Sequence, residues 1–138
     1  MNDRTLADRA LRAIQECKRI AQMSEEPNRT TRRFLTPPVR DVHGHLGDRM
    51  ASLGMTVRTD AAGNLRGQWR PQGAHGKRLI LGSHIDTVPN AGAYDGVLGV
   101  VLAIELVEIA QEGRNQDDEV SVLGSGIVEL PSSRPPES

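Results

Sequence analysis

Three residues with metal-binding side chains lie in one glycine-rich stretch of the sequence, from Gly82 to Gly99. His84 and Asp86 are two positions apart, so in extended backbone their side chains lie on the same side. We therefore expect the Asp86 carboxylate to accept a hydrogen bond from one ring nitrogen of His84, which would fix the tautomer and make the other nitrogen a better ligand. Asp95 follows eleven residues after His84, and its two oxygens are able to bridge two cations. The spacing makes His84 and Asp95 candidate metal ligands.

The same residues also have simpler interpretations. His84 could be a hydrogen-bonded surface histidine. Asp95 could be the N-cap of the helix that follows it, because a short acceptor side chain satisfies a free N–H at a helix start. The segment Asp86-Thr-Val-Pro could be a plain turn. Spacing alone leaves these alternatives open.

Hydrophobic periodicity predicts the elements that would position this stretch. The pattern indicates helices and strands in the following order: helices over 5–22 and 39–53, strands over 55–59, 65–69 and 78–83, a helix over 96–112 and a short strand over 120–123. This order predicts an α/β layer with a mixed sheet, in which chemistry gathers at the carboxyl ends of strands. The loop over 83–95 is such a place.

Several of these elements carry more specific expectations. The first helix should bury one stripe, made of Leu6, Ala10, Ile14, Cys17 and Ala21. The run over 78–83 has the composition of a buried strand. Gly96 and Gly99 should allow close approach at the start of the last helix.

The segment GSHIDTVPNAGAYDGVLGVVLAIE resembles the first metal motif of the M20 metallopeptidase-like family, and most closely its allantoate amidohydrolase and N-carbamoyl-amino-acid hydrolase (hydantoinase/carbamoylase) branch. TRRFLTPP at 31–38 and LGMTVRTDAAGNLRG at 53–67 extend the similarity over roughly residues 5–111. The resemblance implies a partial three-layer αβα, zinc-peptidase-like catalytic domain. It also implies that His84 ligates one Zn²⁺ or Mn²⁺ ion, that Asp95 bridges two ions, and that Asp86 has a catalytic part as the partner of His84.

The sequence departs from the family pattern after the last predicted strand. The family continues with a Glu-Glu pair that supplies the general base and a ligand, whereas here Gly124-Ser-Gly follows. Glu25-Glu26 lies in an early loop, where we expect it to be solvated. We therefore expect residues 1–123 to be the N-terminal part of a truncated metal-dependent catalytic domain, and residues 124–138 to be a disordered tail. We further expect this sequence to lack the family's later histidine ligands and the domain through which the family dimerises.

Composition excludes several classes of protein. The net charge is −1 and only 2% of residues are aromatic, so neither nucleic acid nor an anionic membrane is an expected partner. Arg29, Arg32, Arg33 and Arg40 are expected to form a solvated or locally paired face. His43 and His45 point about 200° apart on a helix and cannot chelate one ion together. With one cysteine and no signal segment, a soluble cytoplasmic protein is expected.

The sequence leaves three functions open. The first is a metal-dependent hydrolase of C–N bonds in linear amides or ureido compounds, represented by a fragment that would be inactive alone. The second is an aminopeptidase or deacylase of the same family. The third is a non-catalytic remnant that only binds a partner, an alternative favoured by the missing Glu-Glu pair.

Overall fold

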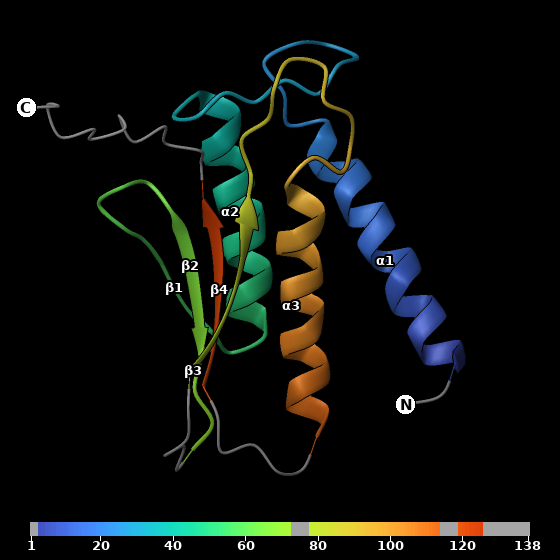
Figure 1. Cartoon of the computed structure of the whole chain (residues 1–138), viewed down its shortest axis with the longest axis vertical. Helices are drawn as coiled ribbons and strands as arrows, with labels where there is room; N and C mark the ends of the chain where they lie inside the picture. The colour runs from blue at the N-terminus through green and yellow to red at the C-terminus, as the bar shows by residue number, and fades with distance from the viewer. Residues whose placement is uncertain (1–2, 73–77, 114–118, 126–138) are drawn as a thin grey trace, which may run out of the picture.

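The computed structural model describes residues 3–72, 78–113 and 119–125. These residues form three helices and four strands (Figure 1), which are α1 (Asp3–Ala21), α2 (Pro37–Ser52), β1 (Thr56–Thr59), β2 (Leu65–Trp69), β3 (Arg78–His84), α3 (Val97–Glu112) and β4 (Glu119–Ser125). Their order is the one predicted from periodicity. Within these ranges no helix combines the length and the hydropathy needed to cross a membrane.

The four strands form one mixed sheet in the order β1-β2-β4-β3. The pairs β1/β2 and β2/β4 are antiparallel, and β3/β4 is parallel. The parallel pair is connected through α3, as a parallel pair requires. The predicted α/β class and mixed sheet are confirmed.

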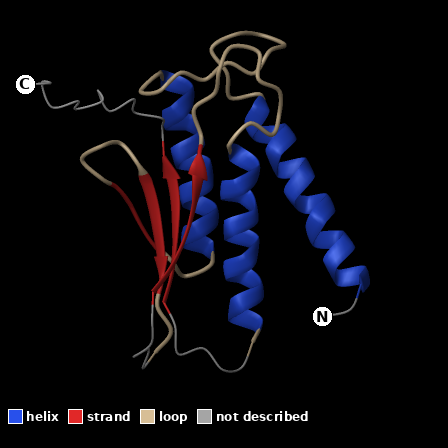
Figure 2. Ribbon diagram, in the orientation of Figure 1, coloured by secondary structure: helices blue, strands red, loops and turns tan. Residues whose placement is uncertain are grey.

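The described helices cover one face of this sheet (Figure 2). Helix α2 packs on β1 and β2, α3 packs on β3 and β4, and α1 packs on α3. The described residues therefore contain a helical layer and a sheet layer of the three-layer arrangement that the family resemblance implied.

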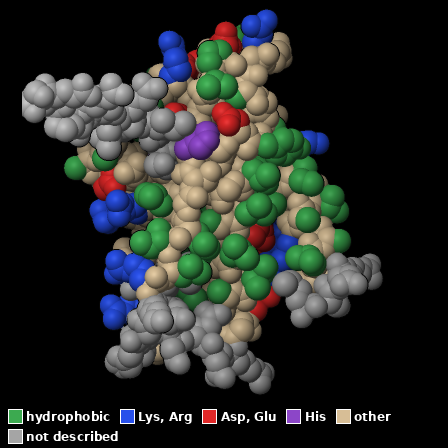
Figure 3. Space-filling view, viewed as in Figure 1, with side chains coloured by type: hydrophobic (Ala, Val, Ile, Leu, Met, Phe, Trp, Pro, Cys, Tyr) green, Lys and Arg blue, Asp and Glu red, His purple; other side chains and the backbone are tan. Residues whose placement is uncertain are grey.

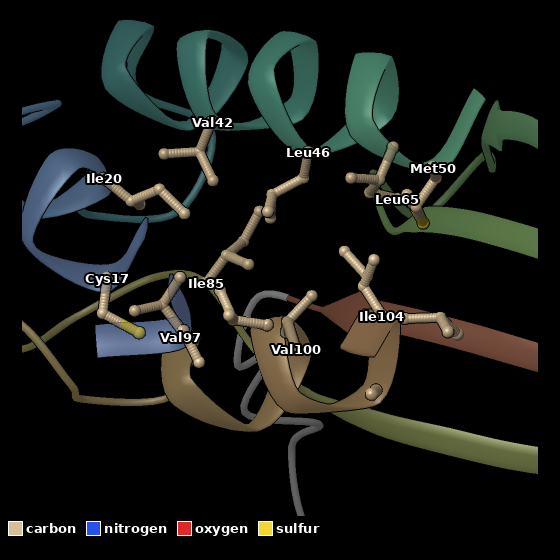
Figure 4. Packing of buried hydrophobic residues seen from close by; sticks show 14 of the residues in the cluster. Cys17, Ile20, Val42, Leu46, Met50, Leu65, Ile85, Val97, Val100 and Ile104 are labelled. Carbon is tan, nitrogen blue, oxygen red and sulfur yellow. The ribbon is translucent and has the colours of Figure 1, made fainter. Parts of the chain in front are cut away.

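The core lies between α2, α3 and the sheet (Figure 4). Leu46 from α2, Ile104 from α3 and Ile85 from the loop after β3 are each at most 1% exposed. Cys17 of α1 is fully buried in the same cluster, which confirms the predicted packing role of its side chain.

The predicted buried stripe of α1 is wrong at several positions. Leu6 is 54% exposed and Ile14 is 39% exposed, and Ala10 is exposed as well. The buried face instead contains Arg9, whose guanidinium pairs with carboxylates of α3. Because ion pairing lets a charged residue occupy the buried face, apolar periodicity alone placed that face incorrectly.

The prediction that residues 78–83 form a buried strand is also wrong. Leu79 is 53% exposed and Ile80 is 63% exposed, because β3 forms an edge of the described sheet. Figure 3 shows further hydrophobic side chains on the surface over α1 and α3, where Leu102 and Leu106 are about half exposed.

The last described strand extends further than predicted. Gly124 and Ser125, which we expected in a disordered tail, belong to β4. A side chain at the buried Gly124 would meet Ile85 and Val100, so this residue is part of the packed structure. The rest of the expected tail, residues 126–138, and His75 lie outside the described residues.

Candidate metal centre

The candidate site is formed where the end of β3 meets the start of α3. His84 is the last residue of β3, Asp86 follows in the loop, and Asp95 directly precedes the N-cap residue Gly96. Gly96 has a φ of 69°, and a Cβ at this position would overlap both Nδ1 and the carbonyl oxygen of His84. A Cβ on Gly99 would lie 2.6 Å from the Cβ of Ser83. The two glycines let the helix start against the strand end, as their positions in the sequence predicted.

The structure brings His84, Asp86 and Asp95 together. Nε2 of His84 lies 3.8 Å from Oδ1 of Asp95. Nδ1 of His84 lies 2.8 Å from the main-chain carbonyl oxygen of Asp86 and 3.3 Å from its Oδ1. The predicted convergence of the three residues is therefore found, with Asp86 and Asp95 on opposite sides of the ring.

The main-chain contact assigns the tautomer of His84. A carbonyl oxygen only accepts hydrogen bonds, so Nδ1 carries the proton and donates to Asp86. Nε2 then has a free lone pair directed to the side of Asp95, which is the arrangement that a metal-ligating histidine needs. The expected acceptor was the Asp86 carboxylate, whose Oδ1 lies 3.3 Å from Nδ1; the shorter contact, 2.8 Å, is to the Asp86 carbonyl.

The N-cap interpretation of Asp95 is wrong. The N-cap of α3 is Gly96, and no side chain makes a capping hydrogen bond there. Only the main chain of Asp95 takes part, through its carbonyl oxygen, which accepts from the N–H of Val97. The Asp95 side chain is 34% exposed and that of His84 is 28% exposed, so both remain accessible to an ion from solvent.

The Asp86 side chain is less accessible and less well satisfied. Its Oδ1 is buried and makes no hydrogen bond with the described residues. A buried carboxylate oxygen without a partner is costly, and such atoms are concentrated at functional sites. Its negative charge acts on the guanidinium of Arg32, which is fully buried.

The burial of Arg32 corrects the prediction of a solvated arginine face. Arg29 and Arg40 are exposed, and Arg33 pairs with Glu25 at 2.7 Å, as a locally paired face requires. Arg32 instead turns inward. Burial lowers the pKa of its guanidinium, and the negative charges of Asp86 and Asp95 oppose that shift. Nothing in the sequence signals this difference, because Arg32 and Arg33 are adjacent residues of the same type.

The site fits a divalent ion at two of its positions. In tetrahedral coordination with metal–ligand bonds of roughly 2.1 Å, two ligand atoms lie about 3.4 Å apart, close to the 3.8 Å between His84 Nε2 and Asp95 Oδ1. Among the described residues, however, no group of three or more His, Cys, Asp or Glu side chains is placed to hold a metal ion. The described residues thus offer two candidate ligands, His84 and Asp95.

The other candidate residues serve different contacts. Nε2 of His45 pairs with Oε1 of Glu16 at 2.7 Å, whereas burial lowers the pKa of the His43 imidazole. Glu25 and Glu26 are not simply solvated: Glu25 pairs with Arg33, and Glu26 accepts a hydrogen bond from the Thr31 hydroxyl. None of these residues takes part in the contacts described for His84.

Comparison with known proteins finds similarity over the segment that carries the candidate residues. The family model of Peptidase family M28 matches residues 64–126, a range that includes both candidate ligands. The ureidoglycolate hydrolase of Arabidopsis thaliana is 36% identical over 91 residues, covering 65% of this chain and 19% of that protein. The chain therefore spans about a fifth of this curated relative.

Two solved structures share the fold. A hydantoinase/carbamoylase family amidase from Burkholderia ambifaria matches with a TM-score of 0.74 and 28% identity, over 83% of this chain and 29% of that chain. The structure of AtUAH in complex with (S)-hydroxyglycine matches with a TM-score of 0.75 and 30% identity, over 83% of this chain and 27% of that chain.

The fold and the matches define a part of an M20/M28-like peptidase fold. More narrowly, the chain belongs to the hydantoinase/carbamoylase family, which contains the allantoate deiminases and ureidoglycolate hydrolases.

Proposed function

We propose that this chain supplies the first metal-binding segment of a divalent-metal-dependent hydrolase that cleaves C–N bonds in linear amides or ureido compounds. The observation that carries the proposal is the pair of contacts on the His84 ring. One nitrogen donates to the Asp86 carbonyl, and the other lies 3.8 Å from Asp95. The ring is thus held with a free lone pair facing a carboxylate.

Within such a hydrolase, each residue has a distinct part. His84 would hold the ion through Nε2, and Asp95 would hold it through one carboxylate oxygen, leaving the second oxygen for a second ion. Asp86 fixes the ring through its carbonyl, and its buried carboxylate places negative charge near Nδ1. A divalent ion bound there polarises a carbonyl and lowers the pKa of water. Zn²⁺ and Mn²⁺ both suit one imidazole and one carboxylate.

The substrate class rests on the relatives. Ureidoglycolate and allantoate, named in the matched proteins, are both linear ureido compounds. The general base and further ligands of a working site are not among the described residues. We therefore propose that the 138-residue chain alone does not turn over these compounds.

A second candidate is an aminopeptidase or deacylase. It is favoured by the match to Peptidase family M28 over residues 64–126. A chimera separates the two candidates. In this chimera, residues 82–99 of the present chain replace the aligned stretch of the Arabidopsis ureidoglycolate hydrolase. Retained release of ammonia from ureidoglycolate supports the first candidate, whereas a chimera that is folded, metal-loaded and active only on dipeptides supports the second.

Metal titration of the purified chain tests the site itself. We expect Zn²⁺ to bind weakly, because two protein ligands hold it. His84→Ala and Asp95→Asn should each lower the affinity at least tenfold, whereas the matched histidine variant His45→Ala should leave it unchanged. Equal affinity in wild type, His84→Ala and His45→Ala would show that the ion binds elsewhere and that the proposed site is wrong.

A further inference from the structure

The loop that carries the site is attached to a distant segment of the chain. Residues 30–32, from the connection between α1 and α2, run beside the loop after β3 (Figure 1). The N–H of Thr87 donates to the carbonyl of Arg32 at 2.8 Å, and the N–H of Ala91 donates to that of Thr30 at 2.9 Å. The N–H of Arg32 donates in turn to the Thr87 hydroxyl at 2.9 Å. Three hydrogen bonds thus join the two segments.

The Arg32 side chain adds a second attachment inside the protein. It is 0% exposed. Its Nε donates to the carbonyl of Ile85 at 2.7 Å, and its Nη1 donates to the carbonyls of Met23 at 2.9 Å and Ile20 at 3.2 Å. One guanidinium thus connects the C-terminal end of α1 to the residue between His84 and Asp86.

The acceptors of Arg32 are neutral carbonyl groups, and within the described residues no carboxylate forms an ion pair with it. A buried charge without an ion-pair partner is expensive, so hydrophobic packing alone would favour an apolar residue here. The guanidinium provides directional hydrogen bonds, because its planar N–H donors approach carbonyl oxygens at fixed angles. The carbonyl it fixes belongs to Ile85, one peptide before the carbonyl that accepts from His84.

We propose that Arg32 is a positioning residue of the candidate metal centre. By holding the Ile85 carbonyl, it fixes the main chain directly after β3 so that the Asp86 carbonyl faces Nδ1 of His84. The ring is thereby kept in the Nδ1–H tautomer with Nε2 toward Asp95. The buried positive charge also offsets part of the negative charge that Asp86 and Asp95 bring to the site. This inference deepens the proposed function, but its first test needs no metal.

The test compares Arg32→Lys with Arg9→Lys. Lysine keeps the charge but cannot reach the Ile85 carbonyl and the carbonyls of α1 together. Arg9 is the matched control, because it is 7% exposed and pairs with Glu108 far from the loop. Nitrogen-15 NMR of the imidazole, with the His84 signals assigned by a His84→Gln variant, reports the tautomer in metal-free protein. Zinc titration reports the affinity at equal folded fraction.

We expect Arg32→Lys to convert His84 from one tautomer to a mixture and to lower zinc affinity at least tenfold, the effect typical of losing support behind a ligand. Arg9→Lys should change neither reading, although it also weakens folding. If Arg32→Lys does not fold, the same readings are made on Arg32→Gln, whose shorter side chain cannot reach the Ile85 carbonyl and the carbonyls of Ile20 and Met23 together. A folded Arg32→Lys or, in its absence, Arg32→Gln protein with the wild-type tautomer overturns the proposal. If the wild-type chain binds no zinc, the proposed function fails while the tautomer reading still decides the role of Arg32.

Discussion

Substituting Gly96 by alanine should destabilise the chain by two separable effects. Its φ of 69° lies in the left-handed region, which costs a residue with a Cβ about 1–2 kcal/mol. The added methyl would also overlap Nδ1 and the carbonyl oxygen of His84. Because one of these atoms is main chain, relief requires moving the helix start from the strand end, at about 1–3 kcal/mol. We expect a total of about 2–5 kcal/mol.

Gly54 provides the control for the first effect. It has a φ of 74° at the end of α2, and a Cβ there would meet no atom within 4 Å. Gly54→Ala should therefore lose only the conformational part, about 1–2 kcal/mol. The measurement is urea unfolding followed by circular dichroism, in which the free-energy difference appears as a lower midpoint at unchanged slope. Equal midpoints for Gly96→Ala and Gly54→Ala would refute the close approach of α3 to His84.

Three further predictions concern other parts of the molecule. Glu105→Gln should lower the free energy of unfolding by roughly 3 kcal/mol, because the Glu105 side chain is only 5% exposed and its arginine partners would lose the negative charge that they face. Glu112→Gln should change the free energy of unfolding little, because the Glu112 side chain is 58% exposed. Burial raises the pKa of Glu105, but Arg49 and Arg12 outweigh burial and hold that pKa below its ordinary value of 4.5. The ionised carboxylate therefore stabilises the folded state above pH 4.5, and this stability is lost as the pH falls below that value. Unfolding measured as a function of pH should show this loss, and Glu105→Gln should flatten the dependence. Burial raises the pKa of the Cys17 thiol, so a thiol reagent at neutral pH should modify it only as fast as the chain unfolds. The purified chain with added Zn²⁺ or Mn²⁺ should release no ammonia from allantoate or N-carbamoyl amino acids, and metal-dependent release that His84→Ala abolishes would contradict this.

Local patterns were enough to predict the elements and the site loop. Helices and strands repeat their side-chain environment every few residues, so the order of the elements can be predicted from short stretches of sequence. The convergence of the candidate residues could be predicted for the same reason: His84 and Asp95 border one loop between a strand and a helix. Gly96 and Gly99 were assigned to close approach because they stand where that helix begins.

The errors arose where distant parts of the chain decide the outcome. Nothing local in β3 shows that β4 pairs with it on one side only, so its exposure could not be predicted. Arg9 and Arg32 resemble surface arginines in the sequence, since their partners lie on α3 and in the site loop. The shorter contact from His84 to the Asp86 carbonyl was missed, because the direction of main-chain groups in a loop is not visible in residue types.

The position of β4 in the sheet has a consequence for the order of folding. Strands β1 and β2 are close in sequence and pair as a hairpin, but among the described strands β3 pairs only with β4, which begins at Glu119. During synthesis, a chain that has emerged only as far as Gly113 would have its helices and its hairpin while β3 still had no neighbour. Pairing across such a sequence separation is slow compared with helix formation. His84 would then acquire its fixed place only after the last strand inserts into the middle of the sheet, and a metal ion would meet a formed site only from that moment.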